Sequence, residues 1–417
     1  MLLDLIAAGA APGHFDVEAA TRAYLDTLQG PARAKSDAYF EGGYWIILWS
    51  ALVGLTSHWL MLRMGWSSAW RRWAERVTTR RWLHPGLYAI PYVIFGSLIV
   101  LPWTIYTGFF REKQYDLMNQ SFAAWAGEQA KGLGIGIVTT VIMLLVIFAV
   151  IRKAPRTWWL WGTAAMTAMI VIMFAIAPVF ISPLFNKYTP MPAGPLRTEI
   201  LAMAQAQRIP ADNVYVFDAS KQSKRISANV SGLGPTIRIS LNDNLLNRST
   251  PAEVKAVMGH EMGHYVLGHI WRLVFFFAAM VFLIALILWW GTARILARWG
   301  ARWGVESAAD PAVVPVYAMV ITVFLLVATP LFNTVTRTEE AEADAFGLDA
   351  AREPDGFASI AMKLSEYRKI EPTPLEEAIF FDHPSGRTRV RGAMAWKAAH
   401  LAELPPAQQA MVVPPKP

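Results

Sequence analysis

Two histidines, His260 and His264, bracket a glutamate, Glu261, in the stretch VMGHEMGHYVLGH. Four residues make about one helical turn, so both imidazoles lie on one helix face and reach one metal ion. Zinc suits this ligand set, because it lowers the pKa of a bound water to about 7 and polarises a carbonyl. Glu261 stands beside the ligands and is expected to take a proton from that water. The motif predicts a hydrolase with one zinc ion per chain and Glu261 as general base.

A catalytic zinc ion needs a third protein ligand and an open position. His269 follows His264 by five residues, about 500° of helix rotation, so we expect it to point away as an interfacial residue. The better candidates lie in TRTEEAEADAFGLDA, where Glu340 and Asp344 are one turn apart. One of the two carboxylates could bind zinc while the other orients a ligand imidazole.

The 417-residue chain is too apolar for a purely soluble protein. Hydrophobic residues make up 54% and charged residues 17%, whereas about a quarter of a typical globular domain is charged. The 18 tryptophans suit a protein anchored at lipid headgroups. With no cysteine, thiolate metal sites and cysteine nucleophiles are excluded. The net charge of +7 indicates arginines facing a lipid bilayer, with no nucleic-acid partner.

Six segments have the length and apolarity of a membrane span, which needs about 20 residues. None carries a formal charge, although the first contains His58. The predicted spans are 43–62, 87–109, 132–151, 158–181, 273–291 and 312–332.

About 90 residues of soluble character separate the fourth and fifth spans. Residues 195–209 have helical periodicity, and 213–218 and 236–241 are typical of short strands. Ser249 or Thr250 is expected to cap the helix that carries the zinc motif. Two spans separate His264 from Glu340, and an even number of crossings returns the chain to the same membrane face.

The sequence thus predicts a mainly α-helical membrane protein with about six transmembrane helices and a zincin-like α+β catalytic domain. Residues 1–20 lack a positive n-region, and Asp4 interrupts their apolar run, so no signal peptide is expected. The predicted parts are an N-terminal tail (1–42), four transmembrane helices (43–181), the catalytic domain with the zinc helix (182–272), two transmembrane helices (273–332), the second part of the catalytic domain (333–404) and a disordered tail (405–417).

Nearly the whole chain after the N-terminal tail resembles the type I CAAX prenyl endopeptidase family. These are integral-membrane zinc metallopeptidases that include bacterial stress-response membrane proteases. The similar segments are 101–120, 177–197 and 218–234, together with TRTEEAEADAF, which matches R-x-x-E-x-x-A-D, and HPSGRTR, which is similar to H-P-x-x-x-x-R. Eukaryotic members have a further span before the first one found here.

The resemblance implies a role for each matching residue. Glu340 becomes the third zinc ligand, and Asp344 and Arg337 support the ligands from behind. His383 hydrogen-bonds the oxyanion, and Arg389 holds the Glu340 region. The substrate is expected to bind as an extended strand beside an edge strand that contains Ala228, Asn229, Val230 and Gly232.

The resemblance also implies a polypeptide substrate that is membrane-associated, membrane-embedded or C-terminally prenylated, or, in a bacterium, quality-control cleavage of membrane proteins. The membrane would be a bacterial inner membrane or one of endoplasmic-reticulum type. A non-proteolytic scaffold or chaperone that retains a zinc site is the main alternative. A transporter or channel is disfavoured, because ionisable groups usually mark the spans of that class.

The arginines conflict with the family over orientation. The family implies a cytoplasmic catalytic side, which we adopt as our expectation. The loops on the other side carry about twice as many positive charges, and the positive-inside rule would place those loops in the cytoplasm instead. The twelve residues are Arg63, Arg71, Arg72, Arg76, Arg80, Arg81, Arg152, Lys153, Arg156, Arg294, Arg298 and Arg302.

Overall fold

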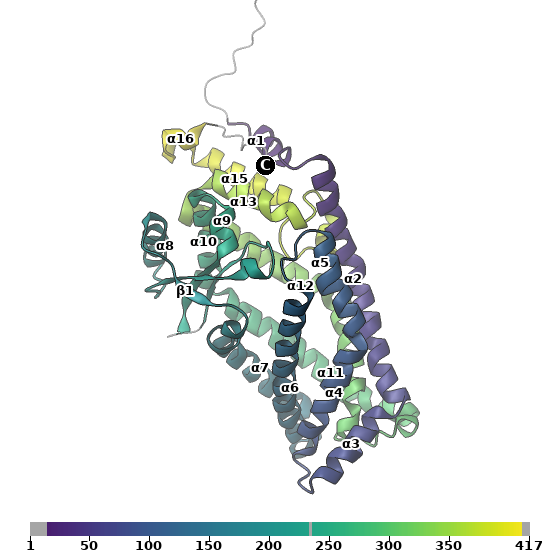
Figure 1. Cartoon of the computed structure of the whole chain (residues 1–417). Coiled ribbons are helices and arrows are strands. Elements are labelled where there is room, and N and C mark those ends of the chain that lie inside the picture. The colour runs from purple at the N-terminus through teal and green to yellow at the C-terminus, as the bar shows by residue number, and fades with distance from the viewer. Residues whose placement is uncertain (1–14, 233–235, 411–417) are drawn as a thin grey trace, which may run out of the picture.

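Six long apolar helices dominate a computed structural model of the chain, which describes residues 15–232 and 236–410 (Figure 1). Each is long and apolar enough to cross a membrane, which confirms the six predicted spans. The helices at 30–63, 122–153 and 269–303 extend beyond the predicted apolar runs at both ends, and the helix at 314–351 does so at its C-terminal end, because flanking residues continue the same helical backbone. They are α2 (Gly30–Arg63), α4 (His84–Ile105), α6 (Phe122–Lys153), α7 (Trp158–Ile176), α11 (His269–Trp303) and α12 (Val314–Ala351).

The predicted catalytic domain (182–272 and 333–404) lies at one end of these helices, together with the described ends of the chain, 15–29 and 405–410 (Figure 1). These residues are called the catalytic part below. α3 (Trp66–Val77) lies at the other end of the helices (Figure 1). A π-helical turn, Tyr106–Phe110, joins α4 to α5 (Arg111–Gln114). The remaining helices belong to the catalytic part. They are α1 (Val17–Leu25), α8 (Pro195–Ala206), α9 (Asp243–Arg248), α10 (Pro251–Val266), α13 (Pro354–Leu364), α14 (Pro374–Phe380), α15 (Gly386–Ala399) and α16 (Pro406–Gln409).

A small sheet covers one side of the catalytic part, in the order β1-β2-β4-β3. The two strands predicted from their β-branched residues are confirmed as β2 (Val214–Phe217) and β4 (Arg238–Asn242), which are parallel neighbours. β1 (Tyr188–Pro190) and β3 (Ala228–Ser231) pair antiparallel to β2 and β4 and form the two edges. The apolar side chains of β2 and β4 share a core with α8 and α10, so the sheet holds α10 against β3.

The helix that carries the histidines begins as predicted. The Thr250 hydroxyl accepts from the Glu253 amide, and the Glu253 carboxylate accepts from the Thr250 amide, which forms a capping box. Glu253 is buried and also accepts from Lys363 Nζ at 2.7 Å. These contacts fix the start of α10 on α13.

α10 and α12 pack through their smallest residues. A Cβ atom on Gly259 would lie 2.9 Å from the Gly347 carbonyl oxygen, and one on Gly347 would lie 2.7 Å from the His260 nitrogen. Gly263 similarly faces the Cα of Ala343, 3.2 Å from where a Cβ would lie. The two backbones therefore approach closely enough for side chains on both helices to share one ion.

The ends of the chain differ from the predicted tails. Residues 17–25 form α1, whose buried Tyr24 and Leu25 share a core with Phe357 and Val390. Residues 30–42, also predicted as tail, form the first turns of α2. Residues 406–409, predicted to be disordered, form α16. The rest of the predicted disordered tail, 411–417, lies outside the described residues. So do residues 1–14 of the segment 1–20, for which no signal peptide was expected.

Replacing Gly347 with alanine is expected to destabilise the protein by on the order of 1–3 kcal/mol, because the new methyl group forces α10 and α12 apart. Gly392→Ala is the matched control, since Gly392 lies in α15 with nothing within 4 Å of the added Cβ. The control should be neutral or stabilising by up to about 1 kcal/mol. Thermal unfolding of both variants in detergent measures the difference, and equal midpoints would contradict the packing argument.

Candidate active site and metal centre

Three side chains from two helices converge where α10 faces α12. His260 Nε2 lies 3.1 Å from His264 Nε2 and 3.2 Å from Glu340 Oε2. His264 Nε2 lies 3.5 Å from Glu340 Oε1. All three ligand atoms lie within 4.8 Å of one another. The structure therefore brings the two motif histidines and the predicted third ligand to one point.

One of the carboxylate oxygens at this point, Oε2 of Glu340, lacks a hydrogen bond of acceptable geometry among the described residues. It is buried, and imidazole nitrogens of His260 and His383 lie within 3.3 Å of it. Buried carboxylate oxygens are normally paired. Two imidazoles and a carboxylate aimed at one point form a donor set that can hold a divalent metal ion.

A second layer of charge lies behind His260. Asp344 Oδ1 is 2.8 Å from His260 Nδ1. Arg389 donates from Nε and Nη2 to the two oxygens of Asp344, at 2.9 and 2.6 Å. The buried guanidinium thus holds Asp344, and Asp344 fixes the orientation of the His260 ring. The predicted contact of Arg389 with the Glu340 region is made through Asp344.

Glu261 lines a small cavity of about 150 Å³ together with His260, His383 and Arg389. Burial raises the pKa of the Glu261 carboxyl to about 7, against the lowering effect of His260. A carboxyl that titrates near neutral pH can both accept and return a proton.

His383 reaches the same point from the loop after α14. Its Nε2 lies 3.3 Å from Glu340 Oε2, and its Nδ1 lies 2.8 Å from Asp382 Oδ1. Arg337 was predicted to support the zinc ligands from behind, but its side chain forms no hydrogen bond or ion pair with them. One helical turn before Glu340, its long side chain turns toward α14 and donates to the Phe381 carbonyl at 2.5 Å. Arg337 therefore anchors the loop that presents His383.

The predicted substrate strand is an edge strand beside the cavity. Among the described strands β3 pairs only with β4, and Ala228 lines the cavity with Glu261. The amide of Asn242 donates to the carbonyl of Ser227 directly opposite, so Asn229 is also in a hydrogen-bonded pair with β4. The backbone groups of Ala228 and Val230 consequently point to the open edge.

Gly232 ends this strand with φ at +99°. A Cβ there would lie 2.1 Å from the Thr236 carbonyl oxygen, so only glycine fits at this position. Gly232 shapes the end of β3.

His269 does not point away from the ligands. α10 ends at Val266, and Gly268, with φ at +70°, starts α11 in a new direction. The rotation predicted for a continuous helix therefore does not apply. His269 is buried, with Nδ1 2.8 Å from His264 Nδ1 and Nε2 3.2 Å from Glu342 Oε2. It supports His264 much as Asp344 supports His260.

Other residues around the cavity were missed by the sequence analysis. Ser227, Tyr367 and Arg368 line it beside His383. Tyr367 and Arg368 lie after α13 in a stretch with no recognisable motif, so no sequence signal marks them. Gly268 was the available signal for His269, because glycine is the usual residue where a helix ends.

Two family models cover most of the chain. One, described as "CAAX prenyl protease N-terminal, five membrane helices", matches residues 23–187. The other, described as "Peptidase family M48", matches residues 190–397, which contain α10 and all three ligand candidates. Four membrane-length helices lie in the described part of the first match.

Relatives and a solved structure agree with the family models. The chain is 27% identical over 351 residues to the uncharacterized metalloprotease YhfN of Bacillus subtilis, covering 82% of this chain and 81% of that one. It is 32% identical over 191 residues to CAAX prenyl protease 1 of Saccharomyces cerevisiae, a match that spans 45% of this chain and 42% of the yeast protein. The crystal structure of S. mikatae Ste24p has a similar fold, with a TM-score of 0.74 and 21% identity, covering 90% and 96% of the two chains.

Fold and site together define an integral-membrane metallopeptidase. The chain belongs to the type I CAAX prenyl protease family.

Replacing His269 with alanine is expected to weaken metal binding by about 10- to 100-fold, because His264 loses the partner that orients its ring. Competition with a chromogenic chelator measures the affinity without depending on catalysis. His84→Ala is the control, since His84 contacts the Thr78 carbonyl directly after α3, and α3 lies at the end of the helices opposite the catalytic part (Figure 1). Unchanged affinity in the His269 variant would rule out this role.

Proposed function

We propose that this protein is a zinc endopeptidase, with His260, His264 and Glu340 as the ligands of one zinc ion. The observation that carries the proposal is the spacing of the donor atoms. Tetrahedral zinc with ligands at about 2.0–2.2 Å places neighbouring donors roughly 3.3–3.6 Å apart. The two imidazole nitrogens lie 3.1 Å apart, and each approaches one oxygen of Glu340, His260 at 3.2 Å from Oε2 and His264 at 3.5 Å from Oε1. With one ligand atom taken from each residue, all three atoms lie within 4.8 Å of one another. The residues present therefore fit the ion.

The side chains around this point divide the work of peptide hydrolysis. When bound, zinc supplies a Lewis acid that polarises the scissile carbonyl and lowers the pKa of water. Glu261 takes the proton from the attacking water and delivers it to the leaving amine, which suits a carboxyl with a pKa of about 7. His383 borders the same cavity and donates a hydrogen bond to the developing oxyanion.

The substrate binds as an extended strand along β3. The outward backbone groups of Ala228 and Val230 pair with the peptide, which places its scissile bond beside Glu261. In this binding mode the hydrogen bonds are made to the peptide backbone and depend little on the side chains. It therefore suits substrates that are selected by their attachment to the membrane.

The substrates we propose are membrane-associated polypeptides, either C-terminally prenylated or, in a bacterium, damaged membrane proteins. CAAX prenyl protease 1 of S. cerevisiae and the homologues of that name support the first kind. A non-proteolytic scaffold is disfavoured, because the site retains its base.

We place the catalytic part on the cytoplasmic side, as the family resemblance implies. A C-terminal reporter active only outside the cytoplasm would contradict this orientation.

Glu261→Gln is expected to keep the metal and lose about 10²- to 10⁴-fold in kcat, because the amide cannot take a proton. The assay compares three substrates with the purified full chain: a farnesylated CAAX peptide, the same peptide without the farnesyl group, and an unfolded membrane polypeptide. Glu199→Gln, on α8 and paired with Lys255, is the control. A zinc-loaded wild-type protein that cleaves none of the three would favour the scaffold.

Ala228→Pro tests the substrate strand. Proline removes an outward N–H without removing a bond to β4, and edge strands tolerate it. We expect a raised KM for peptide cleavage with unchanged zinc affinity. Asn229→Pro, which removes an inward N–H, should instead lower the unfolding midpoint. A wild-type KM in the Ala228 variant would argue against strand addition at β3.

A further inference from the structure

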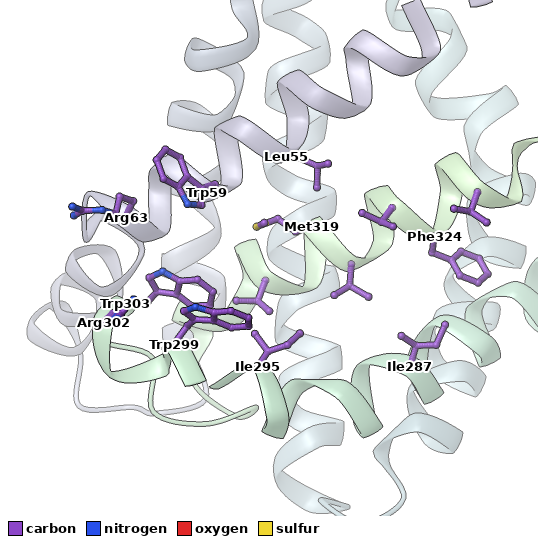
Figure 2. Close-up of a pocket in the computed structure, with 14 residues that line it drawn as sticks. Leu55, Trp59, Arg63, Ile287, Ile295, Trp299, Arg302, Trp303, Met319 and Phe324 are labelled. Atoms are coloured by element: carbon purple, nitrogen blue, oxygen red, sulfur yellow. The ribbon is translucent and has the colours of Figure 1, made fainter. Parts of the chain in front are cut away.

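A long groove lies on the membrane part, at the end near α3 and away from the metal site (Figures 1 and 2). It has a volume of about 1210 Å³ and runs between α2, α11 and α12. Apart from two arginines, every residue that lines it is apolar or a tryptophan. Several of these side chains are well exposed, with Val323 at 48% and Val327 at 75%. The groove is therefore open along its length.

Both charged residues lie at one end of the groove. Figure 2 shows Arg63 and Arg302 at the end that also holds Trp59, Trp299 and Trp303. Arg63 is the last residue of α2, and Arg302 precedes the last residue of α11. Tryptophan and arginine at helix ends are typical of the level of lipid headgroups. This end of the groove therefore lies at the membrane surface.

The two guanidinium groups have no acidic partner within 4 Å in the part of the chain that the structure describes. Neighbouring Arg71 differs, because it pairs with Glu306 at 2.7 Å and Asp310 at 3.1 Å. The headgroup end thus presents two unpaired positive charges on opposite walls of an apolar channel. Its charge is complementary to a phosphate group.

The length of the groove indicates what fills it. Its walls cover residues 55–63 of α2, 316–327 of α12 and 287–303 of α11, rises of about 12, 17 and 24 Å. The hydrocarbon core of a bilayer is about 30 Å thick, and one leaflet is about half of that. A transmembrane partner helix would extend beyond this groove, whereas an acyl chain of one leaflet matches the walls on α2 and α12.

The geometry points to a binding site for an anionic glycerophospholipid from the leaflet on the α3 side. The phosphate lies between Arg63 and Arg302, the tryptophans surround the glycerol region, and an acyl chain extends past Val323 toward Val327. The bound lipid links the ends of α2 and α11 through their charges, so it stabilises the end of the bundle opposite the active site.

Native mass spectrometry of the full chain in detergent tests the site, with phosphatidylglycerol and phosphatidylcholine added separately. The wild-type protein should retain one phosphatidylglycerol per chain in preference to phosphatidylcholine. The double variant Arg63→Gln/Arg302→Gln should bind it about 30-fold more weakly, because each of the two arginines near a lipid surface contributes about 1 kcal/mol and each 1.4 kcal/mol is a factor of ten. The control Arg76→Gln/Arg80→Gln removes two exposed charges from the same end at residues that do not line the groove, and it should bind as wild type.

A second pair of variants tests the channel without changing charge. Val323→Trp fills the groove and should abolish retention, whereas Leu325→Trp, exposed on α12 outside the groove, should not. Wild-type retention by the double arginine variant, or equal loss in its charge control, would overturn the site. The site would also be overturned if the wild-type protein formed a dimer without bound lipid and Val323→Trp dissociated that dimer.

Discussion

The close approach of α10 and α12 is the constraint on which the site depends. Side chains bound to one ion must come from backbones a few ångströms apart, and here the backbones meet at Gly259, Gly263 and Gly347. Any larger residue at these positions would separate His260 from Glu340. The helix pair also brings together residues that lie 80 positions apart in the chain, because Glu340 follows two membrane spans after His260.

Each histidine of the site is oriented by a different device. A buried carboxylate and guanidinium, Asp344 and Arg389, hold His260. His264 meets His269, which the break at Gly268 turns back toward the site. That break also changes the direction of the chain where it enters the membrane. The catalytic helix is therefore separate from the membrane helix that follows it, and α10 takes its position from α12 and the sheet.

The two ends of the molecule face different chemistry. At one end, β3 presents its outward backbone groups beside the cavity of Glu261, in a region built from short helices and a small sheet. At the other end, apolar walls and unpaired arginines meet at the level of the headgroups. The long helices connect these ends, so the position of the active site above the membrane is set by the same elements that hold the proposed lipid. This arrangement suits the proposed substrates, which are themselves attached to the bilayer.

The sequence by itself determined the six spans, the capped helix, two strands and the two histidine ligands. These depend on local signals, namely apolar length, helical spacing and residue chemistry. Local signals left the third ligand open between Glu340 and Asp344, and the family resemblance selected Glu340. Only the tertiary structure decided how α10 meets α12, that residues 17–25 join the catalytic core, that Arg337 anchors the His383 loop, and that His269 adjoins His264. Most of these contacts join segments that are distant in the sequence, and no local pattern encodes which distant segments will pack together. The contact of His269 depends on the change of backbone direction at Gly268, and the spacing of a continuous helix does not predict it.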